Sequence, residues 1–135
     1  METENHLPWA VSRQDFSREA LEAGDDAACC VFVIDESIPV RARTGYSALV
    51  MAYARSAEPV TVLVGGGAVL LIRDGGTDSA RIAGRRVIDQ ARKLGLEHTL
   101  RAGVARVDGD ADAAIDQARH AATEVAAGEV GPEAT

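Results

Sequence analysis

Three consecutive glycines between two apolar runs place the strongest constraint on how this chain can fold. The runs are Val60–Val64 and Ala68–Arg73, and the glycines are Gly65, Gly66 and Gly67. Glycine adopts positive φ without steric cost, so the pattern predicts a β-hairpin with a tight glycine turn. Because a hairpin joins antiparallel strands, the sheet that contains it cannot be all-parallel.

Hydrophobic periodicity predicts further elements on both sides of this hairpin. The apolar run Ala27–Ile34, bounded by acids, is typical of a buried central strand. Ser12 is placed to cap the first helix and Thr77 to cap a later one. The expected elements are, in chain order, a helix over Ser12–Ala23, a strand over Ala27–Ile34, a helix over Gly45–Ser56, the hairpin, a helix over Thr77–Leu94 ended by Gly95, a strand over Leu100–Val107 and a helix over Ala111–Ala127.

This order of elements predicts an α+β fold of the ferredoxin-like or palm type. We expect an antiparallel or mixed sheet of about four to five strands, with helices packed on one face. The length of 135 residues accommodates one domain. We expect a flexible lead-in over residues 1–10, the domain over residues 11–128 and a disordered tail over residues 129–135.

The charge balance limits the classes of partner. Acidic residues number 21 against 14 basic ones, which gives a formal net charge of −7. Such a surface repels nucleic acid and anionic lipid at long range, so we expect no DNA partner. No apolar run approaches the roughly 20 residues of a membrane span, and residues 1–8 resemble no signal peptide. We therefore expect a cytoplasmic protein that does not associate with membranes.

Two features of the side chains each allow a functional and a structural interpretation. The adjacent Cys29 and Cys30 lie in the predicted central strand, where reduced core thiols are expected and a reactive thiol is the alternative. A cluster of basic side chains on the helix over residues 77–94 is either a solvated face or a patch for an acidic partner or a nucleotide phosphate. Its members are Arg81, Arg85, Arg86, Arg92 and Lys93.

Short motifs at the joints of these elements resemble those of the GGDEF domain, the diguanylate cyclase family. The resemblance covers roughly residues 11–128, nearly the whole chain, and it depends on the order of the motifs. The matching segments are Ser12-Arg13-x-x-Phe16 in the first helix, Val31–Asp35 at the end of the first strand, Val64–Val69 at the hairpin, Gly103-Val104-Ala105 in the late strand and Ala118-x-x-Ala121 in the last helix.

The resemblance implies a nucleotide site at the end of the first strand. Asp35 is then the metal ligand, Asp35 and Glu36 are vestigial catalytic acids, and Gly65–Gly67 contact a phosphate. Mg²⁺ is the implied ion if a nucleotide binds. The family carries an acid pair after its first two glycines, whereas Gly67 and Ala68 stand there in this chain. A solvated acid at Asp35 and a purely structural glycine turn are the alternatives.

From this departure we interpret the chain as a catalytically inactive, GGDEF-like bacterial signalling module. It would act through a protein partner or self-association, with GTP, ATP or a cyclic dinucleotide as candidate ligands. One alternative is a minimal active nucleotidyl cyclase that uses Asp35, Glu36 and a further acid. Another is an unrelated α/β adaptor, whose sign would be a strand order other than that of the palm.

Overall fold

The computed structural model describes residues 11–24, 26–35, 37–39, 41–42, 60–62 and 67–131. The expected helix over Gly45–Ser56, the lead-in over residues 1–10, and Glu36, Gly65 and Gly66 lie outside these ranges. The outcomes below concern the described residues.

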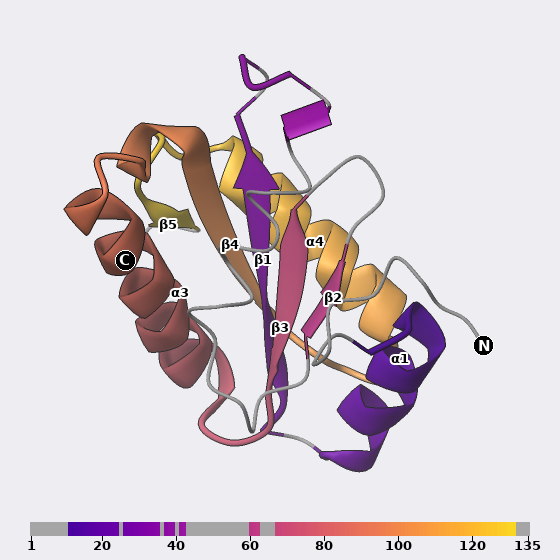
Figure 1. Ribbon diagram of the computed structural model, residues 1–135. Helices are drawn as coiled ribbons and strands as arrows, with labels where there is room; N and C mark the ends of the chain where they lie inside the picture. Colours follow the sequence, from indigo (N-terminus) through magenta and orange to yellow (C-terminus); the bar gives the residue numbers. More distant parts are fainter. Residues whose placement is uncertain are drawn as a thin grey trace.

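In the described part of the chain, five strands form one mixed sheet in the order β2-β3-β1-β4-β5 (Figure 1). β1 pairs antiparallel with both β3 and β4, β2 pairs antiparallel with β3, and β5 runs parallel to β4. This arrangement confirms the expected α+β palm with a mixed sheet. The strands are β1 (Ala28–Ile34), β2 (Val60–Val62), β3 (Ala68–Ile72), β4 (Leu100–Arg106) and β5 (Val130–Gly131).

The pairing of β2 with β3 confirms the hairpin predicted from the glycine run. Val62 lies opposite Ala68, and Gly67 has a φ of 99°, as a glycine turn requires. On its other side, Ala68 lies opposite Phe32 of β1. The start of β3 and the end of β1 therefore share one edge of the sheet, where Asp35 follows β1.

The described helices are α1 (Arg13–Glu22), α3 (Gly76–Lys93) and α4 (Ala111–Thr123), with a 3₁₀ turn over Glu97–Thr99. The predicted cap at Ser12 is confirmed, because its hydroxyl oxygen accepts a hydrogen bond of 3.0 Å from the Asp15 N–H. The predicted cap at Thr77 is wrong. Gly75, with a φ of 94°, turns the chain into the helix two residues earlier and occupies the cap position without a side-chain hydrogen bond.

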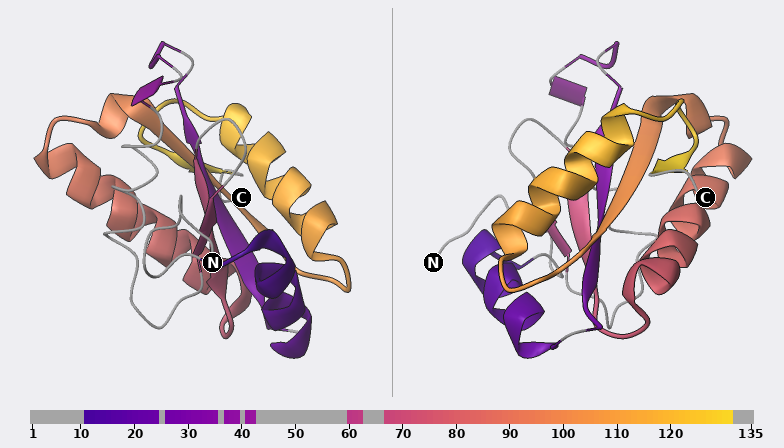
Figure 2. Two further views of the ribbon diagram at one scale, coloured as in Figure 1. Left: turned by 45° about the vertical axis from the view of Figure 1, so that its right-hand side comes forward. Right: turned by 180° about the vertical axis from the view of Figure 1, so that it is seen from behind.

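The expectation that helices cover one face of the sheet is wrong. Figure 2 shows α3 on one side of the sheet and α1 and α4 on the other. Cys30 and Phe32 of β1 pack in the core under α3, whereas Cys29 and Val31 pack in the core under α1 and α4. Consecutive strand residues point to opposite faces, so a strand that is apolar at every position requires cover on both faces.

α4 lies unusually close to β4 because Gly103 has no side chain. A Cβ atom at Gly103 would lie 1.9 Å from the Ala118 carbonyl oxygen and 2.6 Å from the Ala122 amide nitrogen. Such distances are far inside van der Waals contact, so only glycine fits here. The close approach brings the end of α4 to the edge of the sheet where β4 begins.

Of the expected disordered tail over residues 129–135, only residues 129–131 are described, and they include a short strand. α4 ends at Thr123 instead of Ala127, and Val130 and Gly131 form β5. Val130 is only 5% exposed and belongs to the core under α3. Burial of this side chain and pairing with the otherwise open edge of β4 explain why Val130 and Gly131 form a strand there.

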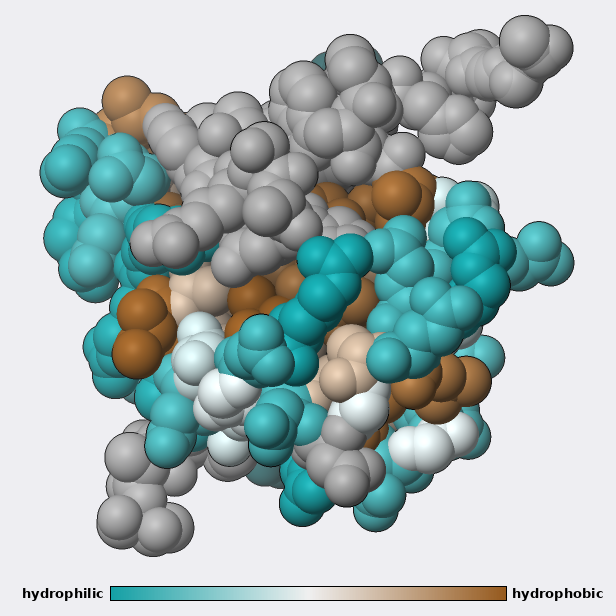
Figure 3. All heavy atoms as spheres, turned by 90° about the horizontal axis from the view of Figure 1, so that it is seen from below, coloured by the Kyte–Doolittle hydropathy of each residue, from teal (hydrophilic) through white to brown (hydrophobic). Residues whose placement is uncertain are grey.

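Few large hydrophobic side chains are exposed among the described residues. On the face shown in Figure 3, hydrophobic atoms appear in separate patches among hydrophilic ones. The large hydrophobic side chains that are exposed are Leu21, Ile82 and Leu94. Within the described ranges, every helix is too short or too polar to cross a lipid bilayer.

Candidate functional site

Asp35, the predicted metal ligand, lies at the edge of the sheet where β1 ends. Its N–H donates a hydrogen bond of 2.8 Å to the Thr99 carbonyl oxygen, which extends the pairing between β1 and β4 by one residue. Its side chain is 25% exposed. Gly67 reaches the same edge through the hairpin, so the structure brings Asp35 and the described end of the glycine turn to one edge of the sheet.

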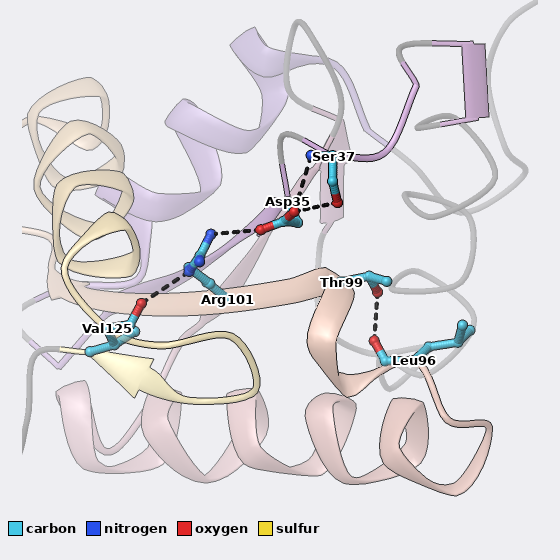
Figure 4. Close-up of polar contacts among 6 residues, drawn as sticks. All are labelled: Asp35, Ser37, Leu96, Thr99, Arg101 and Val125. Carbon is cyan, nitrogen blue, oxygen red and sulfur yellow. Dashed lines mark hydrogen bonds and ion pairs between the residues drawn. The ribbon is translucent and has the colours of Figure 1, made fainter.

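Both carboxylate oxygens of Asp35 accept hydrogen bonds (Figure 4). One accepts from the Arg101 guanidinium at 3.1 Å. The other accepts from the Ser37 hydroxyl and, at 3.0 Å, from the Ser37 N–H. The Ser37 hydrogen bonds, followed by the charge of Arg101, lower the pKa of the Asp35 carboxyl below its usual value. We call Asp35, Ser37 and Arg101 the strand-end cluster.

Arg101 is held from two directions. Its Nε donates a hydrogen bond of 3.0 Å to the Val125 carbonyl oxygen, just after α4, while its Nη1 contacts Asp35. The positive guanidinium is favourable near the negative end of a helix dipole. Arg101 therefore ties together the end of β1, the start of β4 and the end of α4.

The strand-end cluster is a poor fit for a magnesium ion. It contains a single carboxylate, that of Asp35, which is already paired with Arg101 and Ser37. The guanidinium of Arg101 also repels a second cation at this position. No group of three or more Asp, Glu, His or Cys side chains that could hold a metal ion is found among the residues the structure describes.

The other predicted site residues have mixed outcomes. Gly67 is buried and has the positive φ of a turn residue, which agrees with a structural role. Glu36, Gly65 and Gly66 lie outside the described residues, so a phosphate contact by the glycine turn stays a prediction. Ser37 and Arg101 were missed, since Arg101 is 66 positions from Asp35 and no local pattern links the two.

Both cysteines are free and buried, as expected for reduced core thiols. Burial raises the pKa of the Cys29 thiol to about 12. The thiolate, which is the nucleophile, is therefore scarce at neutral pH. The alternative of a reactive thiol at Cys29 finds no support in this environment.

The basic cluster on α3 divides into two parts in the structure. Arg81 points toward β5 and donates a hydrogen bond of 3.1 Å to the Val130 carbonyl oxygen. The other members line a shallow surface hollow of about 760 Å³. We call this surface the α3 outer face; its principal residues are Ile82, Arg85, Arg86, Asp89, Arg92 and Lys93.

Comparison with known proteins identifies the fold. No protein-family model matches the chain, and no match was found among curated proteins. Among solved structures, the chain is similar to a truncated form of TpbB (also called YfiN) from Pseudomonas aeruginosa that comprises only the GGDEF domain. The TM-score is 0.64 at 19% sequence identity, and the match covers 93% of this chain and 92% of the other.

The chain therefore has the fold of a GGDEF domain, and the resemblance drawn from its motifs is confirmed at the level of architecture. The match extends over nearly the whole of both chains. The strand order β2-β3-β1-β4-β5 is that of the palm, so the different order expected for an unrelated α/β adaptor is not seen among the described strands.

Proposed function

We propose that the protein is a GGDEF-like signalling module that lacks cyclase activity and acts in the cytoplasm through a partner protein. The observation that carries the proposal is the contact of 3.1 Å between Asp35 and Arg101. This contact places a guanidinium beside the carboxylate that a catalytic metal would need.

The chemistry of nucleotide joining explains why this contact matters. Two divalent metals activate the attacking hydroxyl and neutralise the leaving pyrophosphate in such reactions. Carboxylates must hold both metals, and Gly67 and Ala68 supply none on the hairpin. A guanidinium offers positive charge, but it has no coordination site at which a hydroxyl oxygen could bind and have its pKa lowered, as it would on a metal. Arg101 thus stabilises Asp35 without restoring the reaction.

Nucleotide binding is a separate part of the proposal. GTP, ATP or a cyclic dinucleotide can approach the edge of the sheet where Gly67 and Asp35 lie, since backbone N–H groups at a glycine turn bind phosphate well. Any Mg²⁺ would enter with the nucleotide and be held mainly by its phosphates. We infer that a bound nucleotide is not turned over.

The test is an assay of GTP and ATP turnover with Mg²⁺ or Mn²⁺, resolved by chromatography. We expect no cyclic or linear dinucleotide from the wild-type chain, and none from Asp35→Ala or Arg101→Ala. Calorimetric titration with GTP, ATP and cyclic di-GMP then measures binding independently of turnover. A dinucleotide product that disappears in Asp35→Ala would overturn the proposal and favour a minimal active cyclase.

A further inference from the structure

The α3 outer face carries charge of the opposite sign to the molecule as a whole. α3 contains five basic residues and two acidic ones, a net charge of +3, in a chain of net charge −7. Arg85 and Lys93 are exposed on this face. Arg92 contacts Asp89 at 2.9 Å, an exposed pair that contributes little to stability. The face therefore presents the positive charges of Arg85, Arg92 and Lys93 to solvent.

An exposed isoleucine lies at one end of the same face. Ile82 is 67% exposed, the largest fraction among the exposed large hydrophobic side chains of the described residues. Arg85 and Asp89 follow it at spacings of three and seven residues, so the three lie on one side of the helix. The face thus combines one apolar side chain with a row of charges, over a hollow of about 760 Å³.

We propose that the α3 outer face docks an acidic amphipathic helix of a partner protein. An apolar side chain of that helix would pack on Ile82, and its carboxylates would pair with Arg85, Arg92 and Lys93. From Ile82 to Lys93 the face spans roughly 16 Å, or about three helical turns. The inference rests on the proposed function, because it names the partner through which a non-catalytic module would act.

The charges argue against a second copy of this chain as the occupant. Two α3 outer faces carry charge of the same sign and repel each other. At the start of α4, Asp110 caps the helix and Asp112 lies 3.0 Å from Arg13, whose positive charge opposes the approach of a second basic face. A separate acidic protein therefore fits better than head-to-tail self-association.

A nucleotide is also a poorer fit than an acidic helix. Ile82 offers an apolar contact that phosphate groups cannot use. Asp89 lies within the row of cations and repels the closely spaced charges of a polyphosphate. Carboxylates spaced along a helix can instead avoid Asp89 and contact the cations on either side of it.

The test uses a fluorescein-labelled peptide of about three to four helical turns, with Leu on one side and Glu on the other. Fluorescence anisotropy measures its binding to the 135-residue chain at low and high salt. We expect Arg85→Glu to weaken binding by about tenfold or more and Ile82→Gln by about fivefold. Binding should also weaken as salt rises.

Matched variants elsewhere on the surface provide the controls. Arg119→Glu makes the same charge change on exposed α4, and Leu21→Gln removes an exposed apolar side chain from α1. Both should change the affinity by less than about twofold. Thermal unfolding of every variant verifies that the fold is intact, and amide chemical shifts perturbed by the peptide should map to α3.

Three results would overturn the inference. They are equal weakening by Arg119→Glu and Arg85→Glu, displacement of the peptide by GTP, and a dimer in sedimentation that Arg85→Glu dissolves. The peptide assay contains no nucleotide, so its outcome does not depend on catalysis. Dinucleotide synthesis would overturn the proposed function alone, whereas non-specific peptide binding would overturn only the docking surface.

Discussion

The carboxylate of Asp35 receives hydrogen bonds from two sides, from Ser37 two positions further along the chain and from Arg101 on the neighbouring strand β4. Each donor favours the ionised form of the carboxyl group. These hydrogen bonds exist in the folded state and not in the unfolded chain. The ionised form is therefore favoured more strongly in the folded state, which makes the stability of the domain depend on pH.

The sign of this dependence follows from the lowered pKa of Asp35 in the folded state. The stabilising contribution is complete above the unfolded carboxyl pKa of about 3.9. It is lost as the pH falls through the lower folded value, because protonation removes the charge that Arg101 and Ser37 favour. We therefore predict that Asp35→Asn lowers the free energy of unfolding at pH 7 and that its difference from wild type shrinks below about pH 4.

Denaturant titrations of both proteins at pH 7 and pH 3 measure this difference. Asp116→Asn, at an exposed position on α4, serves as the control and should stay close to wild type at both pH values. A constant difference between Asp35→Asn and wild type across the whole pH range would contradict the prediction.

At the scale of elements, the packing of α4 on β4 depends on the absent side chain at Gly103. The helix backbone occupies the space that a Cβ atom would take, with Ala118 O only 1.9 Å from that position. Backbone atoms inside a helix cannot give way singly, so a Cβ atom at this position would displace α4 as a whole. The Gly103-Val104-Ala105 motif is thus explained by packing, independently of any ligand.

We predict that Gly103→Ala destabilises the domain by about 3 kcal/mol or more, since the added methyl group forces α4 away from the sheet. The displacement should also weaken the contact between Arg101 and the Val125 carbonyl. Urea unfolding followed by far-UV circular dichroism measures the loss. Gly109→Ala is the matched control: a Cβ there meets nothing within 4 Å, and its φ of 79° adds only backbone strain of about 1–2 kcal/mol. Equal losses in the two variants would contradict the packing argument.

At the scale of the whole molecule, one sheet separates two hydrophobic cores and belongs to both. Phe16 and Ile115 lie in the core under α1 and α4, whereas Val87 and Ile88 lie in the core under α3. β1 contributes side chains to both cores and has hydrogen-bonded neighbours on both edges. It therefore should open only when the entire domain unfolds.

We predict that backbone amides exchange more slowly in the central strand β1 than in the edge strand β5. Amides in β1 should exchange through global unfolding, at a free energy on the order of 5–15 kcal/mol. Amides in the two-residue β5 at the edge should exchange through local opening. The free energy of that opening should be at least about 2 kcal/mol lower than the value for β1. Native-state exchange followed by NMR measures both values. Protection in β5 equal to that in β1 would contradict this ranking.

Local patterns in the sequence predicted the elements that depend on neighbouring residues. The glycine run predicted the hairpin, Ser12 predicted the start of α1, and the apolar run Ala27–Ile34 predicted β1, because turns, caps and strand patterns arise from contacts within a few positions. The order of the motifs also predicted the GGDEF-like fold. β1 is apolar at every position and therefore requires cover on both faces, which the expectation of helices on one face did not take into account.

Contacts between distant residues were decided only by the tertiary structure. Arg101 meets Asp35 across 66 positions, and β5 pairs with β4 although its two residues carry no strand pattern. Thr77 is a good cap residue, yet Gly75, with a φ of 94°, occupies the cap position of α3 two residues before it. The sequence by itself determined where catalytic carboxylates are missing, at Gly67 and Ala68. The folded chain decided that a guanidinium sits beside the acid that remains, because only the pairing of β1 with β4 brings the two side chains together.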